Sequence, residues 1–93
     1  MELSRKRVAP RPEVLTRELQ GQLVLLNVET ETYFGLDDVG TRFWSVLTTS
    51  PSLRVAMDTL LEEFDAPPAD LERDVRKLVD QLNEEGLVDI VDL

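Results

Sequence analysis

The spacing of the apolar residues changes along this chain near residue 37. Before that point they form two short runs, 23–28 and 33–36, and the polar segment 29–32 lies between them. Short runs of β-branched, aliphatic and aromatic residues on either side of a polar link are typical of a β-hairpin. Together with residues 13–19, where polar residues flank Leu15, they predict a three-stranded antiparallel sheet.

After residue 37 the apolar residues recur every three or four positions, which is the spacing of an amphipathic helix. Three such stripes follow one another, and prolines at 51, 67 and 68 separate them. Their members are Val39, Phe43, Val46 and Leu47; Leu53, Met57, Leu60, Leu61 and Phe64; and Leu71, Val75, Leu78, Val79 and Leu82. Residues 87–91 fit a short final strand. Strands followed by helices predict an α+β domain, and three strands followed by three helices describe a winged helix-turn-helix.

The length and composition narrow the possible functions. A chain of 93 residues is expected to form one domain, and we place it at 13–93, after a basic and partly flexible N-terminal segment at 1–12. The chain contains no Cys and no His, which excludes thiol nucleophiles, disulfides, histidine-based triads and the usual zinc ligands. We therefore expect no catalytic residue, no metal and no cofactor. The absence of Cys also fits a cytoplasmic protein.

The charge distribution argues against nucleic acid as a partner. The net charge is −9, and residues 69–86, which include the third helical stripe, hold three basic and six acidic side chains. A helix that enters a DNA groove needs surplus positive charge. No run of 18 apolar residues is present, so no membrane span is expected either.

A peptide is a more plausible partner, because the strand at 33–36 is expected at the edge of the sheet. An edge strand has unpaired backbone groups that can pair with an incoming peptide strand. Tyr33 and Phe34 point to opposite faces of that strand, so one enters the core and the other can meet a ligand. The sequence does not say which does which. On the third helix, Val79 lies at the edge of the apolar stripe, where it is either part of the core or also part of a groove.

Several motifs, in their order along the chain, resemble the PqqD-like family of precursor-peptide recognition elements. The similarity is greatest to the stand-alone recognition proteins of lasso peptide biosynthesis and covers about residues 13–91. The motifs are Tyr33-Phe34-Gly35-Leu36, Asp37-x-x-Gly40-x-x-x-Trp44, Leu60-Leu61-x-x-Phe64, Asp70-Leu71-x-x-Asp74-Val75 and Leu82-x-x-x-Gly86-Leu87-Val88.

The resemblance implies a winged helix-turn-helix whose third strand and third helix bind the leader of a ribosomally made precursor by strand addition. It implies a Tyr-x-x-Pro element in the leader, a separate cysteine protease that cleaves it, and no bond chemistry in the recognition protein itself. Carried onto this chain, the implied leader-binding residues are Thr32, Tyr33, Phe34, Leu71, Val75, Arg76, Val79 and Asp80.

Three alternatives remain open. A PqqD-type chaperone would present its peptide to a radical SAM enzyme instead of a protease. A winged-helix DNA-binding regulator would share the architecture, but the charge of the third helix opposes it. A small hydrolase or isomerase would need a cleft with paired carboxyl groups, whereas the acidic residues here fall on solvated helix faces.

Overall fold

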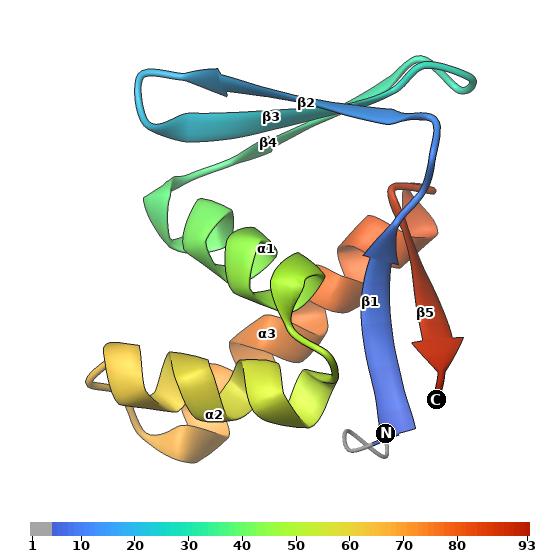
Figure 1. Ribbon diagram of the computed structural model, residues 1–93. Helices are drawn as coiled ribbons and strands as arrows, with labels where there is room; N and C mark the ends of the chain where they lie inside the picture. Colours follow the sequence, from blue (N-terminus) through green and yellow to red (C-terminus); the bar gives the residue numbers. More distant parts are fainter. Residues whose placement is uncertain (1–4) are drawn as a thin grey trace.

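The fold was obtained as a computed structural model that describes residues 5–93, with two small sheets and three helices (Figure 1). The strands are β1 (Lys6–Pro10), β2 (Val14–Leu19), β3 (Gln22–Asn27), β4 (Thr32–Leu36) and β5 (Val88–Asp92). The helices are α1 (Asp38–Thr49), α2 (Leu53–Glu63) and α3 (Pro68–Glu84). The predicted α+β fold, an antiparallel sheet followed by three helices, is confirmed, and so is the final strand.

The sheet β2–β3–β4 is the predicted meander, with β3 in the centre. Gln20 and Gly21 connect β2 to β3, and both have positive φ, 55° and 82°. Two successive residues of positive φ form the tight hairpin turn whose twist matches that of the flanking strands. The turn fixes the register, in which Leu19 lies opposite Gln22.

The second sheet is a two-stranded ribbon of β1 and β5, and it revises the expected division of the chain. Residues 1–12 were set apart from the domain, but Lys6–Pro10 pairs with Val88–Asp92 over its whole length. Val8, in the middle of β1, is 1% exposed and belongs to the hydrophobic core. Local pattern could not reveal this strand, because its partner lies about 80 residues further along the chain. The prediction for residues 1–4 falls outside the described residues.

The start of α1 holds the helix close to the sheet. The Asp37 side chain accepts a hydrogen bond from the Gly40 backbone N–H at 2.7 Å and so caps the helix. A Cβ on Gly40 would lie 3.2 Å from the side chain of Leu36, the last residue of β4. Glycine therefore permits the close approach of α1 to β4.

The core lies between the helices and the inner faces of the two sheets. Its buried members are Val8, Leu25, Leu36, Phe43, Trp44, Val46, Leu47, Leu53, Ala56, Met57, Leu60, Leu71, Val75, Val79, Leu82, Leu87 and Val88. Phe43 of α1 and Phe64 after α2 pack edge to face with ring centroids 5.3 Å apart. Among the described residues, no helix is long and apolar enough to cross a membrane.

Candidate functional site

The free edge of β4 is the main feature of the candidate site. In residues 5–93, β4 pairs with β3 on one side and with no strand on the other, as predicted. The Val28 N–H donates to the Glu13 carbonyl at 3.2 Å, so even-numbered residues of β3 direct their backbone groups to β2. Because these groups alternate in direction along an antiparallel strand, odd-numbered residues of β3 bond to β4.

The same alternation shows which groups of β4 are free. Residues Thr32, Phe34 and Leu36 lie opposite odd-numbered residues of β3 and turn their backbone N–H and C=O groups towards it. Tyr33 and Gly35 therefore turn theirs outward, to the open edge. A Cβ on Gly35 would meet no atom within 4 Å, which shows that this part of the strand is uncrowded. An incoming strand would find its backbone partners at these two residues.

The two faces of β4 differ, and the structure answers which aromatic residue points outward. Phe34 is half-buried and packs against the core on the inner face. Tyr33 is 71% exposed on the outer face, where it lies opposite Leu26. Leu26 in turn lies opposite Leu15, which is 58% exposed, so the outer face of the sheet carries an apolar row across all three strands. The Thr32 hydroxyl accepts a hydrogen bond from the Thr30 hydroxyl at 2.9 Å, at the start of β4.

Three of the residues expected at the site on α3 lie in the core. Leu71, Val75 and Val79 are at most 3% exposed. They hold the helix against the rest of the domain, and their side chains are not at the surface. Of the two readings left open for Val79, the structure supports a place in the core.

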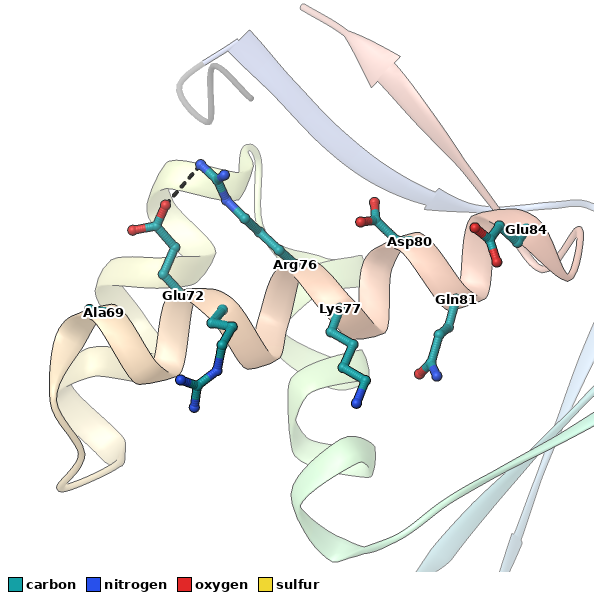
Figure 2. A pocket seen from close by; sticks show the side chains of 8 residues that line it. Ala69, Glu72, Arg76, Lys77, Asp80, Gln81 and Glu84 are labelled. Carbon is teal, nitrogen blue, oxygen red and sulfur yellow. Dashed lines mark ion pairs between the residues drawn. The ribbon is translucent and has the colours of Figure 1, made fainter.

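The polar side chains of α3 divide between two sides of the helix. Arg76 and Asp80, which were expected at the site, lie on the same side as Glu72, and the Arg76 guanidinium is 2.8 Å from the Glu72 carboxylate (Figure 2). Lys77 and Gln81 point to the opposite side, where Figure 2 shows the fainter green ribbon of α1 and β4. An open hollow follows this polar surface and is lined by Ala69, Glu72, Arg73, Arg76, Lys77, Asp80, Gln81 and Glu84.

The residues on the Lys77 side of α3 were not among those expected at the site. The half-buried Leu78 belongs to this set as well, since it packs against the core from the edge of the helix. The helical wheel separates Lys77 and Gln81 from Arg76, but a wheel cannot tell which edge of the stripe turns towards a sheet. The structure brings Thr32, Tyr33 and Phe34 together on one strand and leaves Arg76 and Asp80 on the side of α3 away from Lys77.

Asn27, the last residue of β3, positions the β3–β4 hairpin relative to the end of α3. Its side chain is fully buried. The amide nitrogen donates to the Gly86 carbonyl at 2.7 Å, and the amide oxygen accepts from the N–H groups of Glu29 and Thr30 at 3.0 and 3.2 Å. Gly86 takes a φ of +73° after α3, as a helix-ending glycine does. An Asn inside an apolar strand was the one sequence signal for this role.

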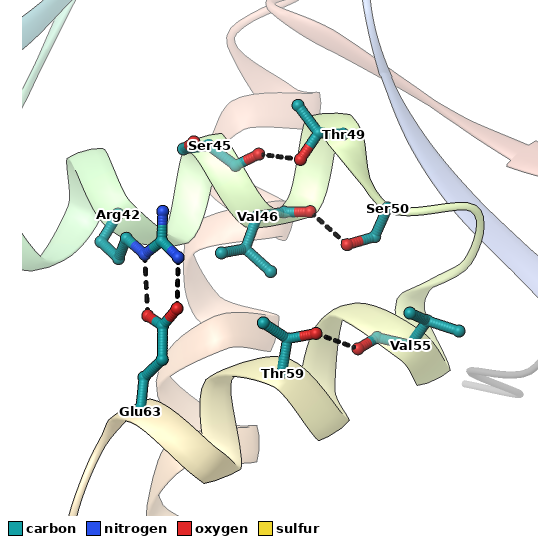
Figure 3. Close-up of polar contacts among 8 residues, drawn as sticks. All are labelled: Arg42, Ser45, Val46, Thr49, Ser50, Val55, Thr59 and Glu63. Atoms are coloured by element: carbon teal, nitrogen blue, oxygen red, sulfur yellow. Dashed lines mark hydrogen bonds and ion pairs between the residues drawn. The ribbon is translucent and has the colours of Figure 1, made fainter.

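An ion pair between Arg42 and Glu63 joins α1 to α2 (Figure 3). The Arg42 Nε donates to Glu63 Oε2 at 2.7 Å, and this hydrogen bond lowers the pKa of the Glu63 carboxyl. Glu63 in turn raises the pKa of Arg42. Both side chains lie on the solvated surface of α1 and α2, where the pair links the two helices. Among residues 5–93, no three acidic residues come close enough together to hold a metal ion.

Comparison with known proteins gives one family and two solved structures. The family model described as coenzyme PQQ synthesis protein D (PqqD) matches residues 22–88. A structure of TbiB1 in complex with the TbiA(beta) leader peptide is 31% identical, covers 87% of this chain and 94% of that one, and superimposes with a TM-score of 0.79. A lasso peptide synthetase B1 complexed with the leader peptide is 27% identical and covers 88% of this chain and 96% of its own, with a TM-score of 0.78. Among curated proteins, none matches.

Proposed function

Because this chain belongs to the PqqD family, as a PqqD-like recognition element, we propose that it binds the leader of a ribosomally made precursor peptide by strand addition to the free edge of β4. The observation that carries the proposal is this open edge in a fold whose two solved neighbours are each complexed with a leader peptide. Strand addition uses backbone hydrogen bonds for affinity and side-chain contacts for specificity.

The geometry of β4 assigns different tasks to its residues. Tyr33 and Gly35 supply outward N–H and C=O groups to the leader backbone. Leader side chains on the inner face of the extended sheet contact Phe34 and the side of α3 that carries Lys77 and Leu78. Leader side chains on the outer face lie beside the Tyr33 ring. An apolar anchor, such as the Tyr or Pro of the Tyr-x-x-Pro element, suits the inner face because Phe34 is half-buried there.

Delivery to a separate cysteine protease is part of the same proposal. The proposed contacts are backbone groups and apolar side chains, and the chain has neither Cys nor His with which to cleave a peptide bond itself. Leader capture therefore supplies binding, and the bond chemistry falls to the partner enzyme. Since ribosomes make the precursor in the cytoplasm, the proposal places this chain there as well.

Amide hydrogen exchange tests the mode of binding at single residues. The probe is a synthetic TbiA(beta) leader peptide, which one solved neighbour binds, and a scrambled peptide of the same composition is the control. In the free protein the amides of Phe34 and Leu36 should exchange slowly and those of Tyr33 and Gly35 quickly, because only the first pair is bonded to β3. The leader should slow the second pair at least tenfold, because those N–H groups become hydrogen-bonded. Tight binding with no added protection at Tyr33 and Gly35 would show that the leader lies elsewhere.

A titration with the same leader, followed by amide chemical shifts, decides which side of α3 contacts the leader. The proposal places the largest shifts of the helix at Lys77, Leu78 and Gln81. The earlier expectation for Arg76 and Asp80 stays a prediction, and larger shifts at these two residues would move the site to the other side of the helix.

A second candidate function shares the binding mode but differs in the enzyme served. The matching family is described by PQQ synthesis, which suits a chaperone that presents its peptide to a radical SAM enzyme. Both solved neighbours are instead leader complexes, and one of them is a lasso peptide synthetase B1, which favours the protease. Leader cleavage by a leader protease of lasso peptide biosynthesis, assayed with and without this chain, separates the two.

A further inference from the structure

The outer face of the sheet β2–β3–β4 is exposed and apolar. Figure 1 shows the three helices together on the inner side of the sheet, where α1 contacts β3 and β4. On the outer side, Leu15, Leu26 and Tyr33 form one row across the three strands, and Val24 and Val28 lie on either side of Leu26 along the chain. Leu15, Val28 and Tyr33 are 58%, 47% and 71% exposed. Exposed apolar side chains that gather on one face mark an interaction surface, whereas scattered ones do not.

This face is also hollowed on both sides of the Tyr33 ring. One open hollow of about 270 Å³ is lined by Leu15, Thr16, Arg17, Val24, Leu26 and Tyr33. A second, of about 390 Å³, is lined by Leu26, Val28, Glu31 and Tyr33. Close packing of side chains into such relief is what distinguishes the centre of a protein interface. The outer face can therefore receive side chains of another protein.

The charged groups at the two ends of this face are opposite in sign. Arg17 lies at one end, where it faces Val24 on β3, and Glu31 lies at the other, in the turn before β4. Within residues 5–93, neither of them forms an ion pair. An apolar centre with a charged rim favours a protein partner whose own rim carries the complementary charges. Such a partner presents a carboxylate to Arg17 and a basic side chain to Glu31.

The position of this face relative to the leader indicates which protein the partner is. A leader strand added to β4 fills the free edge, and the helices cover the inner side of the sheet. An enzyme that acts on the bound leader therefore finds its apolar contact with this chain on the outer side. Alternate side chains of the added strand lie on that side as well, next to Tyr33. The leader and the apolar row of Leu15, Leu26 and Tyr33 then form one continuous surface.

We propose that the outer face of β2–β3–β4 docks the enzyme that cleaves the leader. The proposal rests on leader capture at β4, and it names the surface through which the captured leader is delivered. The enzyme places apolar side chains against the row of Leu15, Leu26 and Tyr33 and complementary charges against Arg17 and Glu31. A second copy of this chain would have to bring its own helices or sheet to the same place and would exclude the enzyme.

The size of the face implies that the leader and the enzyme bind cooperatively. The three strands have six, six and five residues, and only alternate residues face outward. Stable protein interfaces use roughly 20–30 residues on each side. The chain alone therefore supplies too few contacts, and the leader strand widens the face. Leader and enzyme should each strengthen the binding of the other, because such coupling is reciprocal.

Two substitutions test this face without changing the groups that are assigned to the leader. Leu15→Lys and Val28→Lys each put a charge into the apolar surface and leave the backbone bonds of the sheet in place. Val55→Lys is the matched control for Val28→Lys, because Val55 is 42% exposed on α2 and Val28 is 47% exposed. Isothermal titration with the TbiA(beta) leader measures capture. The rate at which a leader protease of lasso peptide biosynthesis cleaves that leader, as this chain is titrated in, measures delivery.

All three variants should fold and should bind the leader with a Kd within about threefold of the wild type. The concentration of this chain that gives half-maximal cleavage should rise by about tenfold or more for Leu15→Lys and Val28→Lys, because a charge is buried in the docked face. It should not change for Val55→Lys. The wild type should bind the protease about tenfold more tightly when the leader is present.

The two measurements separate failure of docking from failure of leader capture. Absence of leader binding by the wild type would refute the proposed function, and docking with it. A wild type that binds the leader without promoting cleavage would overturn docking alone, and so would normal cleavage with Leu15→Lys and Val28→Lys. Loss of leader binding in these two folded variants would assign the face to the leader instead. A dimer of the free chain that Val28→Lys dissociates would assign it to a second copy.

Discussion

A proline at position 35 would test the free edge of β4 most directly. Gly35 turns its N–H away from β3, so a Gly35→Pro substitution removes no bond from the sheet. Edge strands tolerate proline where the missing N–H faces solvent, and the space beside Gly35 is open. The variant should fold, but it can no longer donate a hydrogen bond to a leader strand, and its ring occupies the path of that strand.

The expected loss of affinity follows from the one missing donor. A backbone hydrogen bond contributes about 0.5–1.5 kcal/mol net, and a partner left unpaired on burial costs about 1–3 kcal/mol. We take about 2 kcal/mol for the leader carbonyl that faces Gly35, which corresponds to a roughly 30-fold rise in Kd. Steric exclusion by the proline ring adds to this value, so it is a lower bound for the proposed geometry.

Isothermal titration with the synthetic leader measures the effect, and thermal unfolding checks the fold of the variant. Gly35→Ala is the matched control, because its methyl group meets no atom within 4 Å and its N–H remains. Its Kd should change less than about threefold, well under 1 kcal/mol. A native Kd for Gly35→Pro in a folded protein would refute strand addition at β4, whatever the affinity of the leader for other surfaces.

Three further predictions concern the fold. Val79→Asp should unfold the domain, as seen by circular dichroism, because an unpaired carboxylate in a 1% exposed site costs several kcal/mol; a folded variant would contradict the buried place of this residue. Asn27→Ala should lower the unfolding free energy by about 3 kcal/mol in urea titrations, because three buried backbone groups lose their hydrogen-bond partner. The control Asn83→Ala, at an exposed position, should change it by less than about 0.5 kcal/mol. The pKa of the Glu63 carboxyl is lowered in the folded protein, so its ion pair stabilises the fold at any pH above the ordinary carboxyl pKa of 4.5. This stability is lost as the pH falls through the lower pKa of the folded state. Glu63→Gln should remove that part of the acid dependence and Glu62→Gln should retain it; equal pH profiles for the wild type and Glu63→Gln would contradict the assignment.

The order of elements and the position of the edge strand were predictable from the sequence, because both follow from local pattern. Apolar residues spaced by two or in short runs indicate strands, and those spaced by three or four indicate helices. A meander of three strands leaves its first and last strands at the edges whatever packs beneath it. The strand that ends at Leu36 was therefore predicted as an edge without knowledge of the helices, and the motif order indicated the family.

The orientation of the site residues was not predictable in the same way. Alternation places Tyr33 and Phe34 on opposite faces, but the inner face is defined only once the helices cover one side of the sheet. Likewise, the periodicity of α3 groups Leu71, Val75 and Val79 without showing that the core takes all three. The assignment of Arg76 and Asp80 to the site stays a prediction, and the structure adds only that their side chains lie on the other side of α3 from Lys77 and Gln81.

Pairings between distant segments were decided by tertiary structure alone. The strand β1 has little local signal, and it exists because β5 lies beside it and the core receives Val8. In the sequence, Asn27 is one polar residue in an apolar run. Its role depends on folding, which brings its side-chain nitrogen within 2.7 Å of the Gly86 carbonyl oxygen. Apart from β1, the sequence by itself determined which segments are strands and helices, since that depends on neighbours in the chain. Tertiary structure decided which faces are buried and which edges stay open, since these depend on segments that meet only after the chain has folded.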